Sequence, residues 1–153
     1  MKDRMEEFEN ECIDEGDAKR IDGVSKSKEA ERFENQSDYH LKAAEELIGS
    51  EADLIAIVEG YYSMLHKANQ ALALAGFKAD THKCTLLGLR GVFQESDLAK
   101  SLQESFDERI NVDYYMNPDK PDLKEFKNPE IFVEETVMPF REQIDDIIES
   151  DDL

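Results

Sequence analysis

The sequence predicts an all-α fold, an antiparallel up-and-down helical bundle of five or six helices within a single domain. Apolar residues recur at helical spacing over long stretches, and no segment shows sustained apolar–polar alternation. The chain of 153 residues contains only four prolines and seven glycines, so few points interrupt these patterns. Its length fits one domain that can bury its own core.

The N-terminal part, residues 1–28, is predicted to form a short acidic helix and a connection. Met5, Phe8 and Cys12 follow the i, i+3, i+7 spacing of an amphipathic helix, which weakens at Gly16. Residues 17–28 are polar and contain glycine and serine, which is typical of a connecting segment.

A second helix is predicted from about residue 29 to residue 48, where Gly49 and Ser50 stop it. Ser50 is also a candidate N-cap of the following helix, with Asp53 in a variant of the capping box. The apolar residues predicted to face inward are Phe33, Leu41, Ala44 and Ile48.

The third helix, about residues 51–75, has the strongest periodicity in the chain and is predicted to be covered on most sides. Its alanines allow neighbouring helices to approach closely, and Gly76 is suited to the left-handed C′ position after its end. The main apolar stripe comprises Leu54, Val58, Tyr61 or Tyr62, Leu65, Ala68, Leu72 and Ala75.

Residues 77–80 are predicted as a short turn, followed by a fourth helix from Thr81 to about Phe93. Ser96 is a candidate cap for a fifth helix, which we expect to end near Asn117. The inward residues of these two helices are predicted to be Leu86, Leu89, Phe93, Leu98, Leu102, Phe106 and Ile110.

Residues 117–128 form a proline-bearing loop in this interpretation, and the last helix covers residues 129–150. Asn128 followed by Pro129 is a typical helix start, and Pro139 is expected to kink the helix. Its predicted inward residues are Val133, Val137, Phe140, Ile144 and Ile148.

The charge distribution restricts the classes of partner. The formal net charge is −19, yet residues 39–90 hold five basic and six acidic residues and are nearly neutral. General binding to nucleic acid is disfavoured, because a polyanion is repelled unless a local basic site exists. No apolar run approaches membrane-spanning length, and the first residues lack the apolar segment of a secretory signal, so we expect a cytoplasmic protein.

The usual catalytic and metal-binding signatures are missing. Cys12 and Cys84 are too few and too far apart in the sequence to predict a disulfide framework or a zinc site. Glu-x-x-His, His-Glu-x-x-His, Cys-x-x-Cys, Gly-x-Gly-x-x-Gly and the phosphate-binding lysine loop are all absent. We therefore assign no catalytic residue, metal or cofactor.

Tyr62 and His66 are polar candidates that share one face of the third helix, because they are four residues apart. They are either core rings with a hydrogen bond to a neighbouring helix, or the lining of a groove that takes a base or a phosphate.

Arg109 and Asp113 have the same spacing directly before Tyr114. They form either an ion pair that orients the helix end, or a phosphate donor beside a stacking tyrosine.

Lys78, His82 and Lys83 make the one small basic cluster of this acidic chain. They stand at the predicted start of the fourth helix, where backbone N–H groups and the helix dipole favour an anion. Ordinary surface placement is the alternative.

Four segments together resemble the HEPN ("higher eukaryotes and prokaryotes nucleotide-binding") superfamily, in its small stand-alone prokaryotic branch. The resemblance covers about residues 30–116. The segments are Tyr61-Tyr62-x-x-x-His66, Gly76-Phe77-Lys78, Thr81-His82-Lys83 and Arg109-x-x-x-Asp113-Tyr114. The resemblance implies a helical bundle that forms homodimers and is often encoded beside a minimal nucleotidyltransferase, as in toxin–antitoxin pairs.

Some HEPN proteins are metal-independent ribonucleases with an Arg-x4–6-His element near the C-terminal end of the bundle. His82 is the last histidine of this chain, so no later arginine can be followed by one. We therefore expect a non-catalytic module that binds a nucleotide, RNA or a nucleotidyltransferase partner. The alternatives are a ribonuclease toxin that uses His66 or His82, and a purely structural dimeric helical protein.

Overall fold

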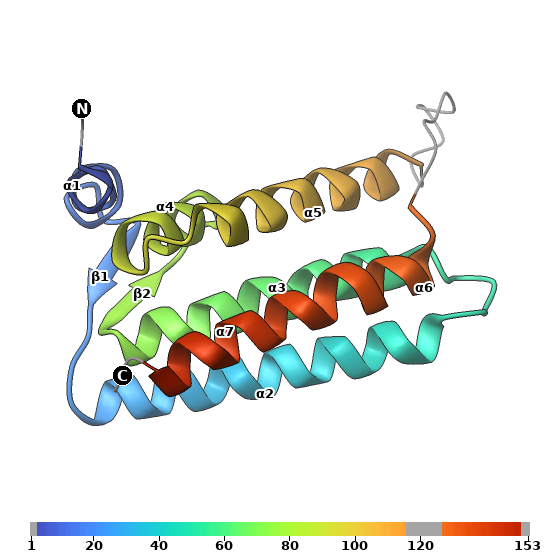
Figure 1. Ribbon diagram of the computed structural model, residues 1–153, viewed down its shortest axis with the longest axis horizontal. Coiled ribbons are helices and arrows are strands. Elements are labelled where there is room, and N and C mark those ends of the chain that lie inside the picture. Colours follow the sequence, from blue (N-terminus) through green and yellow to red (C-terminus); the bar gives the residue numbers. More distant parts are fainter. Residues whose placement is uncertain (1–2, 116–126, 151–153) are drawn as a thin grey trace.

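The computed structural model describes residues 3–115 and 127–150, which form an all-α helical bundle (Figure 1). Its long helices run alternately in opposite directions along the longest axis, as predicted. These are α2 (Val24–Leu47), α3 (Ile55–Leu74), α5 (Ser96–Tyr115) and α7 (Met138–Ser150).

Helix α3 is the centre of the bundle, and α2, α4 (His82–Val92), α5 and α7 all pack against it. A close approach that the sequence interpretation did not name occurs at Gly60, where an added Cβ would lie 2.9 Å from Val137 Cγ2. Fully buried residues of the main core include Ile57, Tyr61, Met64, Ala68, Leu89, Leu102, Val112, Val137 and Ile144.

The N-terminal segment contains more structure than the sequence indicated. Helix α1 (Arg4–Phe8) continues as the π-helical η1 (Glu9–Ile13), and then β1 (Ala18–Arg20) pairs antiparallel with β2 (Phe77–Ala79) (Figure 1). The prediction of a plain connection over 17–28 and a turn over 77–80 was wrong in this respect. Three-residue strands are too short to show an alternation in the sequence.

A buried disulfide joins Cys12 to Cys84, with a Cα–Cα distance of 5.8 Å. The expectation that these cysteines do not form a disulfide framework was therefore wrong for this one bond. The strand pairing brings together segments about 60 residues apart, and the disulfide joins two residues that are 72 apart. A small second core surrounds the bond, and the Phe8 and Phe77 rings meet edge-on there at 5.4 Å.

The start of α3 differs from the prediction. The Ser50 hydroxyl donates to the Leu47 carbonyl at 2.7 Å and accepts from the Ala52 N–H at 3.2 Å. Ser50 therefore belongs to the turn after α2, and its role as an N-cap was wrong, because α3 begins at Ile55. Helix α2 also begins at Val24, five residues before the predicted start.

Two predicted helix boundaries are confirmed around β2. Gly76 has a φ of +96° after the end of α3, the left-handed conformation expected there. Thr81 caps α4 by accepting a hydrogen bond from the Cys84 N–H.

The last helix starts as predicted, because Asn128 Oδ1 accepts from the Ile131 N–H and Pro129 is the first residue of α6 (Pro129–Phe132). The π-helical η2 (Val133–Val137) separates α6 from α7. Pro139 has no N–H to donate to the Glu135 carbonyl, which explains an irregularity at this point. Most of the loop predicted at 117–128 lies outside the described residues.

Within the two described ranges, no helix combines the length and the apolar character needed to cross a membrane.

Candidate functional site

A row of aromatic and imidazole rings runs from α2 across α3 to α4 and α5. Neighbouring rings have centroids 4.2–6.3 Å apart. The row includes all three histidines of the chain. We call it the ring row, and its members are Phe33, His40, Tyr61, Tyr62, His66, His82 and Phe106.

At the α2 end of the ring row, His66 lies between two stacked rings. Its centroid is 6.1 Å from that of Phe33 and 5.3 Å from that of His40, with interplanar angles of 22° and 18°. Its Nδ1 is buried and has no hydrogen-bond partner. Burial lowers the pKa of His66 to about 4, with smaller contributions from His40 and Arg32, so the ring is neutral at pH 7.

A carboxylate on α3 orients His40. His40 Nδ1 lies 2.5 Å from Glu59 Oε2, and each of the two side chains is about one quarter exposed. A carboxylate oxygen only accepts, so Nδ1 donates to Glu59. The imidazole plane is thereby fixed against the rings of Tyr62 and His66.

At the other end, His82 takes part in a hydrogen-bonded chain from α3 to α5. The Tyr61 hydroxyl lies 2.6 Å from His82 Nδ1, and His82 Nε2 lies 3.4 Å from Gln103 Oε1. Since the Gln103 amide nitrogen donates to Asp107, its oxygen faces His82 and accepts from Nε2–H. Nδ1 then accepts from Tyr61.

Burial determines the protonation of this pair. Desolvation lowers the pKa of His82 and raises the pKa of Tyr61, which favours the neutral form of each. The imidazole also stacks on Phe106 at 4.2 Å. His82 is therefore a fixed neutral ring between two aromatic neighbours.

Arg109 on α5 covers the middle of the ring row. Its guanidinium carbon lies 5.1 Å from the Tyr62 centroid and 5.7 Å from the Tyr61 centroid, which are cation–π distances. The predicted ion pair with Asp113 is present, with Nε 3.5 Å from Oδ2. Arg109 Nε is nevertheless buried and makes no hydrogen bond.

The predicted basic cluster is divided in the structure. Lys78 pairs with Glu29 of α2 at 3.5 Å, Lys83 pairs with Glu11 of η1 at 3.8 Å, and His82 faces Tyr61. Each lysine thus has a glutamate partner on another element, although the Lys83 side chain is 66% exposed, and the shared anion site at the start of α4 stays a prediction.

The eight candidate residues thus fall into two groups. Those brought together around the ring row are Tyr62, His66, His82, Arg109 and Asp113. Lys78 and Lys83 pair with glutamates of other elements, and Tyr114 is half exposed near the end of α5.

The sequence interpretation missed Phe33, His40 and Phe106 as members of the row. A signal for the first two was present, because Phe33 and His40 are seven residues apart and so share one face of α2.

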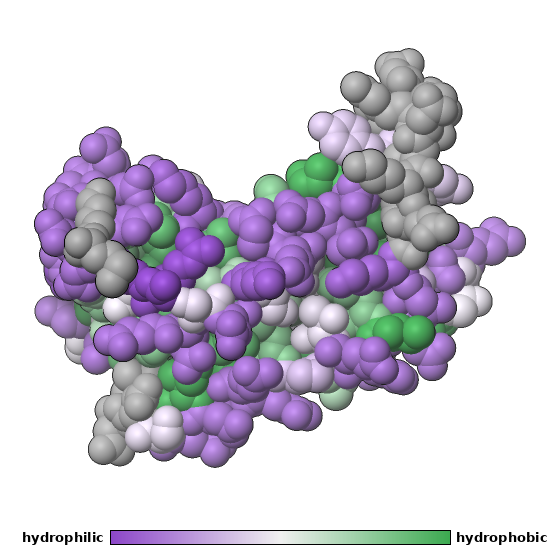
Figure 2. All heavy atoms as spheres, turned by 45° about the horizontal axis from the view of Figure 1, so that its top comes forward, coloured by the Kyte–Doolittle hydropathy of each residue, from purple (hydrophilic) through white to green (hydrophobic). Residues whose placement is uncertain are grey.

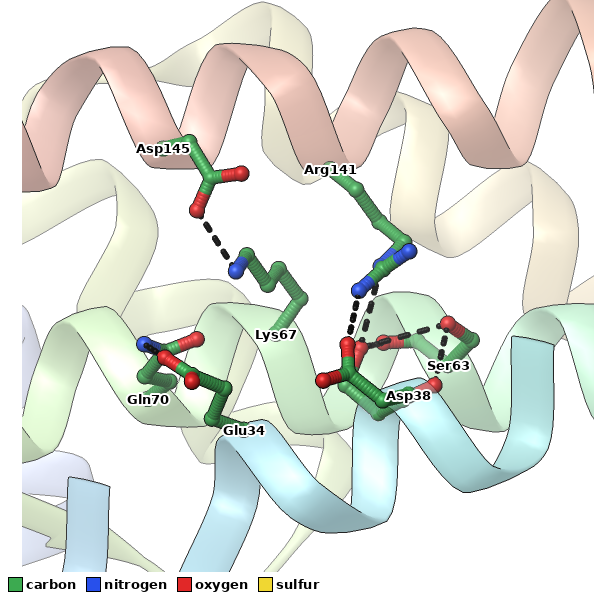
Figure 3. Close-up of polar contacts among 8 residues, drawn as sticks. Glu34, Asp38, Ser63, Lys67, Gln70, Arg141 and Asp145 are labelled. Carbon is green, nitrogen blue, oxygen red and sulfur yellow. Dashed lines mark hydrogen bonds and ion pairs between the residues drawn. The ribbon is translucent and has the colours of Figure 1, made fainter. Parts of the chain in front are cut away.

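A second polar cluster lies where α7 packs on α2 and α3 (Figure 3). The hydroxyls of Ser37 and Ser63 each donate to the other's backbone carbonyl, at 2.7 and 2.8 Å. Arg141 of α7 donates to the Ser37 hydroxyl at 3.2 Å and also contacts Asp38. These bonds join three helices at one point.

Lys67 is the central charge of this cluster. Its side chain is 5% exposed, and Nζ lies 2.5 Å from Asp145 Oδ1 on α7 (Figure 3). Nearby, Gln70 donates to Glu34 of α2 at 2.7 Å. The sequence contained one signal for this cluster, a lysine at position 67 within the strongly apolar helix α3. The bonds of this cluster connect α7 to α2 and α3, so the cluster holds α7 on the bundle.

Among the described residues, no group of three or more His, Cys, Asp or Glu side chains is positioned to hold a metal ion.

Comparisons with known proteins leave the family open. A scan against protein-family models gave no match, and neither did searches of curated proteins and of solved structures.

Proposed function

We propose that this chain is a non-catalytic, HEPN-like helical module that binds a nucleotide or single-stranded RNA at the ring row. The observation that carries the proposal is the position of Arg109, whose guanidinium lies against Tyr62 while neutral rings continue from there to His66. The observed bundle is compatible with the HEPN resemblance, which remains part of the proposal.

Stacking supplies the binding energy in this proposal. Bases stack on aromatic side chains and on arginine planes irrespective of sequence, and each such contact contributes roughly 1–3 kcal/mol. Tyr62 and His66 are only partly buried, so a ligand can reach part of each ring, although Phe33 and His40 already stack on His66.

Two unsatisfied nitrogens support a ligand with hydrogen-bonding edges. His66 Nδ1 and Arg109 Nε are both buried without a hydrogen bond, although Nε lies 3.5 Å from Asp113 Oδ2 in an ion pair. An unpaired buried polar atom costs roughly 1–3 kcal/mol, and a ligand that supplies the missing bond recovers part of it.

The electrostatics favour a base over a long phosphate chain. Asp113, Asp107 and Glu59 all lie beside the ring row, through Arg109, Gln103 and His40 respectively. Two or more added phosphates would be repelled by these carboxylates. We therefore expect nucleoside monophosphates to bind at least as well as triphosphates.

The state of the histidines supports a non-catalytic role. A general acid–base residue works best with a pKa near the working pH. The pKa of His66 is about 4, and both ring nitrogens of His82 have partners. If the chain is a HEPN protein, we expect the ring row to be part of a homodimer or of a complex with a nucleotidyltransferase.

The test is calorimetric titration with the four nucleoside monophosphates, together with fluorescence anisotropy of a labelled single-stranded RNA of about ten nucleotides. Arg109→Ala should lower the affinity for the ligand about tenfold or more. Lys100→Ala, an exposed change on the same helix, is the matched control.

Unchanged binding by Arg109→Ala would show that the ring row is not the site. RNA cleavage that is lost in His66→Ala or His82→Ala would instead support the ribonuclease alternative.

A further inference from the structure

We propose that the groove between α5 and α7 docks a basic amphipathic helix of a partner protein. This inference is independent of the ring row. Two cavities of about 160 and 290 Å³ lie along the two helices, and both are lined by Leu98 of α5 and Gln143 of α7. Because they share these residues, the two cavities adjoin, and we treat them together as one groove.

The lining of the groove combines apolar residues with the polar side chains of Ser101, Thr136, Gln143 and Ser150. Leu98 and Phe140 are almost completely buried there, and Ile147 is partly buried. A large apolar side chain placed in the groove would gain about 25 cal/mol for each Å² of apolar surface removed from water. The partner therefore needs apolar residues on one face.

The rim of the groove is acidic. Carboxylates line it on both sides, and no lysine or arginine is among the residues that line the two cavities. The carboxylates are Glu95, Asp97, Glu135 and Asp146. The complementary ligand carries lysine or arginine beside its apolar face.

The length of the groove suits a helix. Along η2 and α7 its lining runs from Glu135 to Ser150, which corresponds to roughly 20 Å, or about four helical turns. An amphipathic helix that lies in a groove uses anchors at i, i+3, i+4 and i+7 over a similar length.

A second copy of this chain is a poorer occupant. Each copy carries a formal charge of −19. In a two-fold symmetric interface the same patch is used twice, so Asp97, Glu135 and Asp146 would lie near their own equivalents. A dimer of two such chains would also need a large apolar patch. Figure 2, with the α5 side turned forward, shows only small hydrophobic patches within a largely hydrophilic surface.

The probe is a fluorescein-labelled synthetic peptide of about 16 residues, with leucines at i, i+3, i+4 and i+7 and lysines elsewhere. One control peptide has the same composition in scrambled order, and a second has glutamate in place of lysine. Anisotropy titrations use the full chain at low and moderate salt. We expect the amphipathic lysine peptide to bind about tenfold or more tightly than either control.

Matched variants locate the binding. The combined change Asp97→Asn, Glu135→Gln and Asp146→Asn should weaken binding about tenfold. The combined change Glu31→Gln, Glu46→Gln and Glu51→Gln removes the same charge elsewhere on the exposed surface and should alter it less than about twofold.

A single substitution tests the groove itself. Gln143→Arg places a bulky cation where the two cavities meet and should abolish peptide binding. Asn35→Arg adds the same charge on the exposed side of α2 and should leave binding intact. Thermal melting verifies that both variants fold.

Three results would overturn the proposal. They are equal losses in the two combined variants, equal binding of the scrambled peptide, and no binding of the amphipathic peptide to the unaltered protein. A change of oligomeric state caused by Gln143→Arg would assign the groove to a second copy instead.

Discussion

His66 shows how its surroundings determine the behaviour of a single residue. It lies between the rings of Phe33 and His40, and its Nδ1 has no partner. The ring is therefore held by stacking and burial, and both disfavour the charged imidazolium. The sequence placed His66 and Tyr62 on one helical face, but it could not reveal the α2 residues that cover them.

The depressed pKa predicts a dependence of stability on pH. The unfolded histidine binds a proton below its usual pKa of 6.5, whereas folded His66 binds one only below about 4. Between these pH values the unfolded chain binds more protons, so the free energy of unfolding falls as the pH is lowered. Urea denaturation at pH 7 and pH 5 should show a larger loss for the natural protein than for His66→Phe, and equal losses would contradict this account.

The Lys67–Asp145 ion pair leads us to expect different losses of stability when one or the other partner is replaced. The Lys67 side chain is 5% exposed, whereas that of Asp145 is 51% exposed. Asp145→Asn leaves a buried ammonium without its counter-ion and should lower the free energy of unfolding by about 1–3 kcal/mol. Lys67→Met leaves a half-solvated carboxylate and should cost less than about 1 kcal/mol. Chemical denaturation compares the two, and the reverse order would show that the pair does not fix α7.

At the scale of elements, the apolar periodicity identified the helices themselves more accurately than the residues at which they begin and end. The centre of α3 was evident because its apolar residues repeat over 20 residues. The start of α3 was missed, because a serine before an apolar run is typical of an N-cap. In the structure, Ser50 instead makes hydrogen bonds within the turn after α2. The strands β1 and β2 could not be recognised, because each has three residues and their pairing joins distant segments.

The attachment of α1 depends on close contact with Gly91. A Cβ at this position would lie 2.7 Å from the Arg4 carbonyl oxygen and 3.1 Å from Met5 Cα, both backbone atoms. Gly91→Ala should therefore lower the free energy of unfolding by about 1–3 kcal/mol. Gly88→Ala is the matched control and should cost less, because its Cβ would meet side-chain atoms alone, the Leu72 methyl groups at 2.9 Å and Phe8 Cε1 at 3.4 Å. An equal or larger loss for Gly88→Ala in urea denaturation would argue against this packing.

At the scale of the whole molecule, the disulfide connects the N-terminal segment to the bundle. Cys12 of η1 and Cys84 of α4 are both buried in the second core. Their separation of 72 residues gave no signal in the sequence, because their proximity arises from the packing of α1 on α4 and the pairing of β1 with β2. A bond that closes a loop of this length restricts the unfolded chain strongly.

Removing the disulfide should therefore reduce stability. The double change Cys12→Ala and Cys84→Ala should lower the free energy of unfolding by about 4 kcal/mol, from the entropy of the closed loop. Dithiothreitol should have a similar effect on the natural protein and none on the double variant. Identical denaturation curves with and without the reductant would show that the bond does not form or does not stabilise the fold.

The candidate site was predictable only in part. Spacing alone identified the Arg109–Asp113 pair and the shared face of Tyr62 and His66. It could not reveal the glutamate partners of Lys78 and Lys83, because these come from elements distant in the sequence.

The central claim, that the ring row binds a nucleotide, can be tested by the ring signals of the three histidines in an NMR titration. All three histidines belong to the row, so their Hε1 resonances report on it without contribution from the rest of the protein. We predict that adenosine, guanosine, cytidine or uridine monophosphate shifts the signals of His40 and His66 in a saturable manner. Saturable binding that leaves all three signals unmoved, or no binding by any of the four nucleotides, would contradict the account.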